Sequence, residues 1–256
     1  MSRRLPRLFY APALLAVAFF LLPLAGLVAR APWSRFVEEV TRPGVAAALG
    51  LSLATSVAAA ALSFLLGLPL AAWLAAGAGT LRTAVRVLVT LPMVLPPVVG
   101  GVALLFAFGR AGLVGGPLGW SLPFTPAAVV LAETFVALPF LVLTVEGGLR
   151  SFDPRLAEAA HTLGAGPWRV FRTVTLPTVA PALRAGLFVA WARALGEFGA
   201  TITFAGNLEG TTRTLPLAVY TALETAPDTA LVLSLLFVLV SAAVLFALRR
   251  QWFPLR

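Results

Sequence analysis

Long apolar stretches alternate with short polar segments along the whole chain. A membrane-spanning helix needs about 20 mainly apolar residues, and six stretches meet that requirement. The pattern therefore predicts an all-α polytopic membrane protein with six transmembrane helices. The predicted spans are residues 8–29, 45–77, 84–109, 126–148, 179–204 and 229–248.

Prolines inside two of these stretches predict irregular helices. The second stretch is long enough to contain a break, which we expect at Pro69. The third carries LPMVLPPVVGG at residues 91–101, with three prolines and a pair of glycines. Backbone groups freed there need partners from neighbouring helices or from water in a cavity. We therefore expect this segment inside the bundle or beside a pathway, with Pro96 and Pro97 as candidate gate residues.

Composition supports the membrane assignment and excludes several kinds of chemistry. The chain is 60% hydrophobic and 11% charged, whereas soluble domains carry about 25% charged residues. It contains no cysteine, which excludes disulfides, thiol catalysis and cysteine metal sites. The net charge of +9 comes from arginine alone, because the chain has no lysine. In a membrane protein such an excess sets orientation, so we expect no nucleic-acid partner.

The distribution of arginines between the loops predicts how the chain is oriented. With the N-terminus inside, thirteen arginines face the cytoplasm, five face outward and Arg193 lies within a span, as the positive-inside rule requires. We therefore expect a multi-pass protein of the cytoplasmic (inner) membrane with both termini in the cytoplasm. The inward set is Arg3, Arg4, Arg7, Arg82, Arg86, Arg150, Arg155, Arg169, Arg172, Arg184, Arg249, Arg250 and Arg256, and the outward set is Arg30, Arg35, Arg42, Arg110 and Arg213.

The chain is expected to form one transmembrane domain, residues 1–256. Residues 1–44 would contain the first helix and an external loop, residues 45–225 the core, and residues 226–256 the last helix and a cytoplasmic tail. The first segment has the basic start and apolar middle of a signal peptide. Its apolar part is longer than that of a usual signal, so we favour a retained helix and keep cleavage as the alternative.

A polar but organised loop, residues 150–178, follows the fourth span. Asp153 and Pro154 are a helix N-cap and first helical residue, so RLAEAAHTL should form a short helix. GAGP at residues 164–167 then turns the chain. We expect Leu176 and Pro177 to end the following element before the fifth span. A short helix held away from the membrane suits docking on a partner, and a helix lying on the lipid surface is the alternative.

This loop resembles the EAA loop of permease subunits in bacterial ABC importers. In that family the loop forms a coupling helix that docks in a cleft of a cytoplasmic ATPase, and the fold is that of a type I importer permease. The resemblance implies that the ATPase-coupling residues are Glu158, Ala159, Ala160, Gly164, Leu176 and Pro177.

The lack of lysine adds a separate argument about ATP. A phosphate-binding loop places a lysine on the nucleotide phosphates, and this chain has none. ATP and magnesium are therefore expected on a separate ATPase subunit, and this chain is expected to be no enzyme and to hold no cofactor or metal. One chain supplies one coupling loop whereas such importers use two, which favours a homodimer and leaves a heterodimer of permeases as the alternative.

The fifth predicted span carries charge, because ARALGEFGATITF occupies residues 192–204. Arg193, Glu197 and Thr201 recur at intervals of four and would share one face of a helix, beside a stripe of small residues. One interpretation is a buried ion pair that fixes helix packing. The other is a polar stripe lining the translocation route, where the arginine meets an oxyanion, with Thr203 as a further pathway candidate.

Residues 192–224, together with the 91–101 and 158–177 blocks, are similar to molybdate permease subunits of ABC importers. The resemblance implies molybdate as cargo, a periplasmic or lipid-anchored substrate-binding protein, and an external gate within residues 206–228. It leaves tungstate open, with a sulfate permease as the competing assignment. Without the resemblance, an ion-coupled transporter using Arg193, Glu197 and Glu133, or a channel, remains an alternative. We expect Glu133 to be internal, Glu146 at the cytoplasmic interface, and His161 to be a contact residue.

Overall fold

The computed structural model describes residues 7–252, and these form helices joined by short turns. Residues 1–6 and 253–256, including Arg3, Arg4 and Arg256, lie outside the described part. The long helices are α1 (Tyr10–Arg30), α3 (Pro43–Ala75), α4 (Thr80–Val94), α5 (Pro97–Phe108), α7 (Pro126–Arg150), α10 (Leu176–Leu195) and α13 (Pro227–Trp252). The short elements are η1 (Arg7–Phe9), η2 (Trp33–Arg35), α2 (Phe36–Val40), α6 (Gly115–Leu118), α8 (Pro154–Thr162), α9 (Pro167–Val170), η3 (Phe171–Thr175), α11 (Gly199–Phe204) and α12 (Leu215–Thr225).

Within the described residues, five helices are long and apolar enough to cross a membrane. They are α1, α3, α7, the continuous helix Pro167–Leu195, and α13. Helices α4 and α5 pass the same test only together, and the chain bends by 119° between them. Counting this bent pair as one span gives six, so the all-α polytopic fold expected from the sequence is confirmed.

Helix α7 is the centre of the bundle, and α3 and α10 pack against it and against each other. It begins at Pro126 behind an N-cap, Thr125, whose Oγ1 accepts the backbone N–H of Ala128 at 3.2 Å. Glycines allow the close packing: a methyl group on Gly186 of α10 would lie 3.2 Å from Cβ of Thr144. The core therefore depends on small residues that let backbones approach, as is usual between membrane helices.

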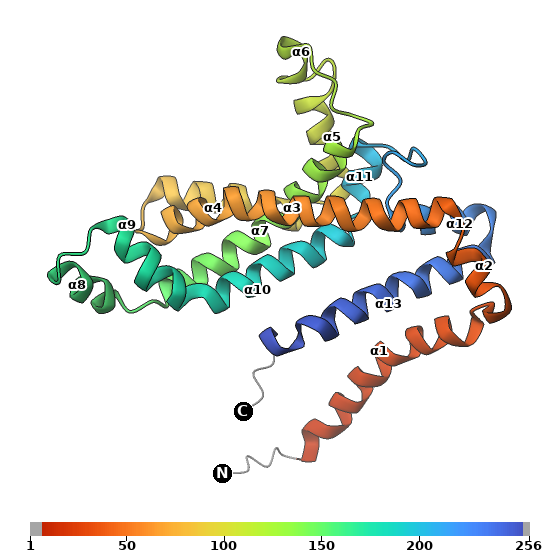
Figure 1. The fold of residues 1–256 in the computed structure, drawn as a ribbon, viewed down its shortest axis with the longest axis horizontal. Coiled ribbons are helices and arrows are strands. Elements are labelled where there is room, and N and C mark those ends of the chain that lie inside the picture. Colours follow the sequence, from red (N-terminus) through yellow and green to blue (C-terminus); the bar gives the residue numbers. More distant parts are fainter. Residues whose placement is uncertain (1–6, 253–256) are drawn as a thin grey trace.

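Helix α1 stands apart from this core. Its apolar side chains are exposed along its whole length, and none of its residues is buried. Figure 1 shows α1 (red) beside α13 (blue), away from α7, with the α5 and α6 pair projecting from the other side of the bundle. Surfaces of this kind face lipid or other protein in a membrane.

The break expected at Pro69 is wrong, whereas the irregular form expected for the third span is confirmed. Helix α3 runs unbroken through Pro69, because neighbouring helices and local adjustment tolerate one missing N–H in a membrane helix. The third span is instead sharply broken: Leu95 and Pro96 are extended, with ψ of 137° and 132°, and Pro97 starts α5. A residue before proline avoids the helical region, so two consecutive prolines end α4. Pro96 and Pro97 are exposed on this chain rather than enclosed within its bundle.

The fifth span also differs from its expected form. Leu176 and Pro177 do not end a helix, since α9, η3 and α10 form one continuous helix from Pro167 to Leu195. The π-helical segment η3 makes this possible: the N–H of Leu176 bonds to the carbonyl of Phe171, five residues back, just before proline removes a donor. The helix ends at Leu195 and restarts at Gly199, so the expected continuous stripe is interrupted at residues 196–198.

Candidate functional site

Helix α8 projects at one end of the bundle, at the end of the molecule opposite α12 (Figure 1). It forms as the sequence predicts: Asp153 Oδ1 accepts the N–H of Arg155 at 3.0 Å, and Pro154 is the first helical residue. At its other end the N–H of Gly164 bonds to the carbonyl of His161 and that of Ala165 to Ala160. These two bonds form a Schellman motif, which requires the positive φ of +83° observed at Gly164.

Helix α8 has an exposed face that carries charged and apolar side chains. Glu158 and Ala159 are exposed, and Leu163 just beyond the helix is among the most exposed apolar side chains of the described chain. The His161 ring contacts the backbone of the turn, where its Nδ1 lies 2.9 Å from the carbonyl oxygen of Ala165. The structure thus brings Glu158, Ala159, Ala160 and Gly164 together on one helix and turn. Leu176 and Pro177 lie farther along, inside the continuous helix, and do not belong to this surface.

The second candidate site lies where α10 ends. Nη1 of Arg193 is 2.7 Å from Oε2 of Glu197, across the last turn of the helix. The glutamate is 1% exposed and the arginine 28% exposed. This Oε2 makes no well-aligned hydrogen bond, so the pair is a charge contact more than a directed bond. The other oxygen, Oε1, accepts the N–H of Ala200 at 2.8 Å and thereby caps the start of α11.

The two broken spans meet at this point. A methyl group on Gly199, the first residue of α11, would lie 2.9 Å from Cβ of Pro97, the first residue of α5. A methyl group on Gly101 would lie 2.7 Å from Cβ of Thr203. The structure therefore brings Pro97, Thr203 and the Glu197 cap into one region, with Thr201 fully buried behind it. The close approach of the two backbones explains why small residues occur at 100–101 and 199–200, which a role in lining a pathway would not by itself require.

Glu133 is internal, as expected, and it contacts α3. Its side chain is buried on α7, and Oγ1 of Thr55 donates to its Oε1 at 3.0 Å. An ionisable side chain buried in a membrane bundle is costly unless it has a polar partner. Thr55 supplies that partner, and the hydrogen bond links α3 to α7. The partner could not be found from the sequence, because 78 residues separate the two positions.

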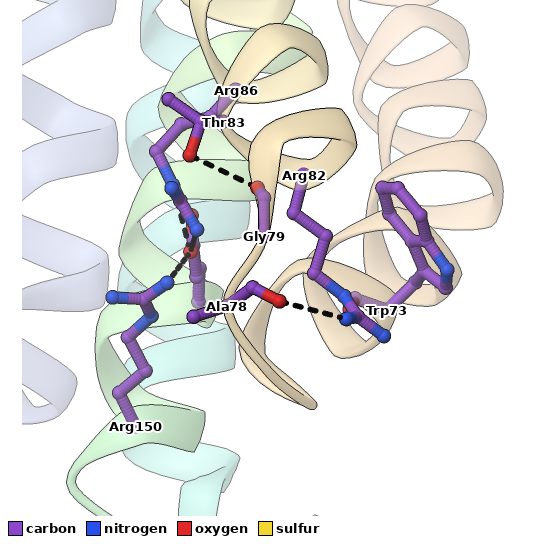
Figure 2. Close-up of polar contacts among 8 residues, drawn as sticks. Trp73, Ala78, Gly79, Arg82, Thr83, Arg86 and Arg150 are labelled. Carbon is purple, nitrogen blue, oxygen red and sulfur yellow. Dashed lines mark hydrogen bonds and ion pairs between the residues drawn. The ribbon is translucent and has the colours of Figure 1, made fainter.

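A cluster of arginines joins α3, α4 and α7 on the α8 side of the bundle (Figure 2). Arg82 donates from Nε to the carbonyl of Trp73 at 3.0 Å, and its Cζ lies 5.1 Å from the centre of that tryptophan ring. Arg86 and Arg150 converge on Glu146, with Nη2 to Oε1 distances of 2.7 and 2.9 Å. Glu146 lies four residues from the end of α7, where it is 5% exposed and shared by two cations.

Only one of the two ion pairs of Glu146 could be predicted from the sequence. Glu146 and Arg150 are four residues apart on one helix, which is pairing distance, whereas Arg86 is 60 residues from the glutamate. The positive-inside pattern predicts an orienting role for the inward arginines. Arg86 also ties α4 to α7, and Arg150 pairs with the same glutamate within α7, just before the chain enters α8.

Comparison with known proteins agrees with this architecture. Residues 64–253 match the family described as binding-protein-dependent transport system inner membrane component. The chain is 49% identical over 243 residues to the molybdenum transport system permease protein ModB of Mycobacterium tuberculosis, covering 94% of this chain and 92% of the relative. It is 36% identical over 210 residues to the sulfate transport system permease protein CysT of Escherichia coli, covering 80% and 76%.

A solved structure gives the same fold. A bacterial ABC transporter involved in the import of the acidic polysaccharide alginate has a chain that superposes with a TM-score of 0.74 at 22% identity, covering 95% of this chain and 94% of that one. The all-α architecture is therefore that of type I ABC importer permeases. By its fold and the match over residues 64–253, this chain is a multi-pass membrane transport component and belongs to the family of inner membrane components of binding-protein-dependent transport systems.

Proposed function

We propose that this chain is the permease subunit of an ATP-driven importer of molybdate. The observation that carries the proposal is the 49% identity, over 94% of the chain, to a protein named as a molybdenum transport permease. The identity to the sulfate permease is lower, 36% over 80% of the chain. Molybdate is therefore the favoured cargo, and tungstate, a tetrahedral dianion of similar size, is expected to share the route.

Coupling to ATP would occur through α8. Its exposed Glu158 and Ala159, its half-buried Ala160 and the turn at Gly164 offer a short helix that fits a cleft on a separate ATPase. That subunit would bind ATP and magnesium, because this chain has no lysine for a phosphate-binding loop. With this arrangement, α8 and both termini would lie in the cytoplasm, and α12 would lie outside and face a periplasmic or lipid-anchored substrate-binding protein. Leu176 and Pro177 would contribute through the π segment rather than by contact.

A second copy of the chain would complete the transporter. The unburied faces of α1, α4 and α5 offer ample apolar surface for a symmetric homodimer. In the dimer, Pro96 and Pro97, exposed on one chain, would lie beside the route between the two copies. Arg193 would then be the cation nearest that route, with Glu197 holding it, and Thr201 and Thr203 would maintain the helix break behind it.

The test is uptake by proteoliposomes that contain the permease, its ATPase and its binding protein. We expect uptake of molybdate that requires ATP, is inhibited by tungstate and is not inhibited by sulfate. Glu158→Arg should abolish it, because a reversed charge on α8 disrupts docking. The matched control is Glu38→Arg, the same reversal on an exposed glutamate of α2, which should leave ATP-dependent uptake intact.

Each alternative has its own result. Equal inhibition by sulfate would widen the cargo to oxyanions in general. Uptake that follows an ion gradient and ignores ATP would replace the proposal with a secondary transporter. Uptake that survives Glu158→Arg would remove α8 from the coupling role.

A further inference from the structure

A polar cavity of about 300 Å³ opens at the end of the bundle opposite α8. It lies between the start of α3, the loop after α11, helix α12 and the start of α13. Unlike the apolar grooves between the spans, it is lined by guanidinium and hydroxyl groups. The polar residues that line it are Arg42, Glu209, Arg213, Thr221, Thr225 and Thr229.

Both arginines are held in place by other side chains. Arg213 donates from Nε to Oδ1 of Asn207 at 2.9 Å, and Asn207 in turn donates to Oγ1 of Thr221 at 2.8 Å. Arg42 is held by Glu39, with an Nη2 to Oε1 distance of 2.7 Å and a glutamate that is 7% exposed. A guanidinium offers five N–H donors in a fixed plane, so each arginine keeps donors beyond those used here.

The backbone adds positive potential to the same cavity. Gly44 and Val45, in the first turn of α3, line its wall, as does Thr229 in the first turn of α13. Helix N-termini carry partial positive charge and attract anions. The convergence of two long helices with two arginines favours a negatively charged occupant.

In this conformation the negatively charged occupant of the cavity is the side chain of Glu209. Oε2 of Glu209 lies 3.0 Å from Nη1 of Arg213. Its Oε1 occupies the space next to Gly44, where an added methyl group would lie 2.9 Å from that oxygen. Glu209 is 66% exposed, so its ion pair is weak and the side chain can swing into solvent at little cost. Glu39 is buried and stays with Arg42.

We propose that this cavity is an external binding site for a free tetrahedral oxyanion, which enters when the Glu209 carboxylate leaves. The oxyanion would accept hydrogen bonds from Arg213 and Arg42 beside the threonine hydroxyls, before it reaches the break at Arg193. The identification of the anion as molybdate rests on the proposed function, whereas the existence of an oxyanion site does not.

The test is binding of molybdate to the full-length permease alone, in phosphatidylcholine nanodiscs, by equilibrium dialysis. We expect saturable binding at one site per chain that weakens as salt is added. Glu209→Gln should tighten it about three- to tenfold, because a competing carboxylate is removed. Arg213→Gln should weaken it at least about tenfold, because charge-assisted hydrogen bonds are lost. Glu224→Gln, the same neutralisation on an exposed glutamate that does not line the cavity, should change nothing.

Several results would overturn the site. They are the absence of saturable binding, a Glu209→Gln variant that binds no tighter, and an equal gain from Glu224→Gln. Competition by phosphatidylglycerol in the nanodiscs would assign the cavity to lipid phosphate and equally remove the proposal. Because Glu209 is exposed, its variant remains informative even if Arg213→Gln fails to fold.

Uptake by the complete importer separates this proposal from the function. If wild-type molybdate uptake requires ATP but the permease alone binds no anion, the site is wrong and the function stands. If the binding pattern appears while ATP-dependent uptake does not, the function is wrong and the site stands.

Discussion

Glu197 is bound at both of its carboxylate oxygens by residues of its own chain segment, with Oε2 2.7 Å from Nη1 of Arg193. The second oxygen accepts the N–H of Ala200 and caps α11. A glutamate placed in this way holds a broken helix in shape and partly neutralises an arginine at the same time. The two interpretations made from the sequence, a packing ion pair and a pathway charge, are therefore compatible at this residue.

Replacing Glu197 should separate its two roles. Glu197→Gln keeps an oxygen that can cap Ala200, whereas Glu197→Ala loses both the cap and the charge. We expect the alanine variant to lower the free energy of unfolding by about 1–3 kcal/mol and the glutamine variant to lower it by clearly less. Thermal unfolding of the purified permease in detergent measures both. Equal losses would show that the cap contributes nothing.

Removing the shared carboxylate between α4 and α7 should be more damaging. Glu146→Ala would leave Arg86 and Arg150 facing each other without their counter-ion. We expect a loss of about 2–4 kcal/mol in the free energy of unfolding, because breaking a buried ion pair leaves uncompensated charge. The control is Arg82→Gln, also in this cluster, where exposed contacts to Trp73 are lost and about 1 kcal/mol or less is expected. Comparable losses in the two variants would contradict the importance assigned to Glu146.

The turn after α8 offers a test of conformation alone. Gly164 has φ of +83° and open space around it, whereas Gly166 has φ of −68° and equally open space. Gly164→Val must pay a left-handed backbone penalty of at least about 1–2 kcal/mol, and Gly166→Val need not. We expect the first variant to insert into membranes normally but to lose ATP-dependent uptake, and the second to keep it. Normal uptake by Gly164→Val would show that the turn is not needed for coupling.

Close packing between the two helix breaks can be probed at Gly101. A methyl group there would lie 2.7 Å from Cβ of Thr203 and 2.8 Å from the carbonyl oxygen of Ala200. Gly101→Ala should therefore lower the free energy of unfolding by about 1–3 kcal/mol. Gly147→Ala, on an exposed face of α7 with nothing within 4 Å, should instead be neutral or slightly stabilising, since alanine is the better helix former. Thermal unfolding of both variants decides the matter.

Local chemistry made α8 and its turn predictable. Asp153 followed by Pro154, and Gly164 after a short amphipathic run, specify a helix start and stop without help from the rest of the chain. The lengths of the apolar stretches likewise predicted the spans, because the thickness of the membrane sets a minimum length for each of them. These features depend on neighbouring residues or on the solvent, both of which are visible in the sequence.

The helix breaks and long-range contacts could not be predicted in that way. The break after Leu195 has local contributions from the C-cap residue Gly196 and from the Glu197 cap, but the packing of Gly199 on Pro97 joins positions far apart in the sequence. Pro69, a strong local breaker, leaves α3 intact because tertiary packing overrides one lost hydrogen bond. The Arg86 partner of Glu146 depends on how α4 lies on α7, which no periodicity reveals.

The unbroken helix from Pro167 to Leu195 has a mechanical consequence. Its 29 residues span about 43 Å at 1.5 Å per residue, so no loop separates the turn after α8 from Arg193, and a displacement at one end would reach the other through a single helix. The π-helical turn at Phe171–Thr175 is the wide turn of this helix. Shifting that turn by a single residue would rotate the rest of the helix by about 100°, and Arg193 would rotate with it.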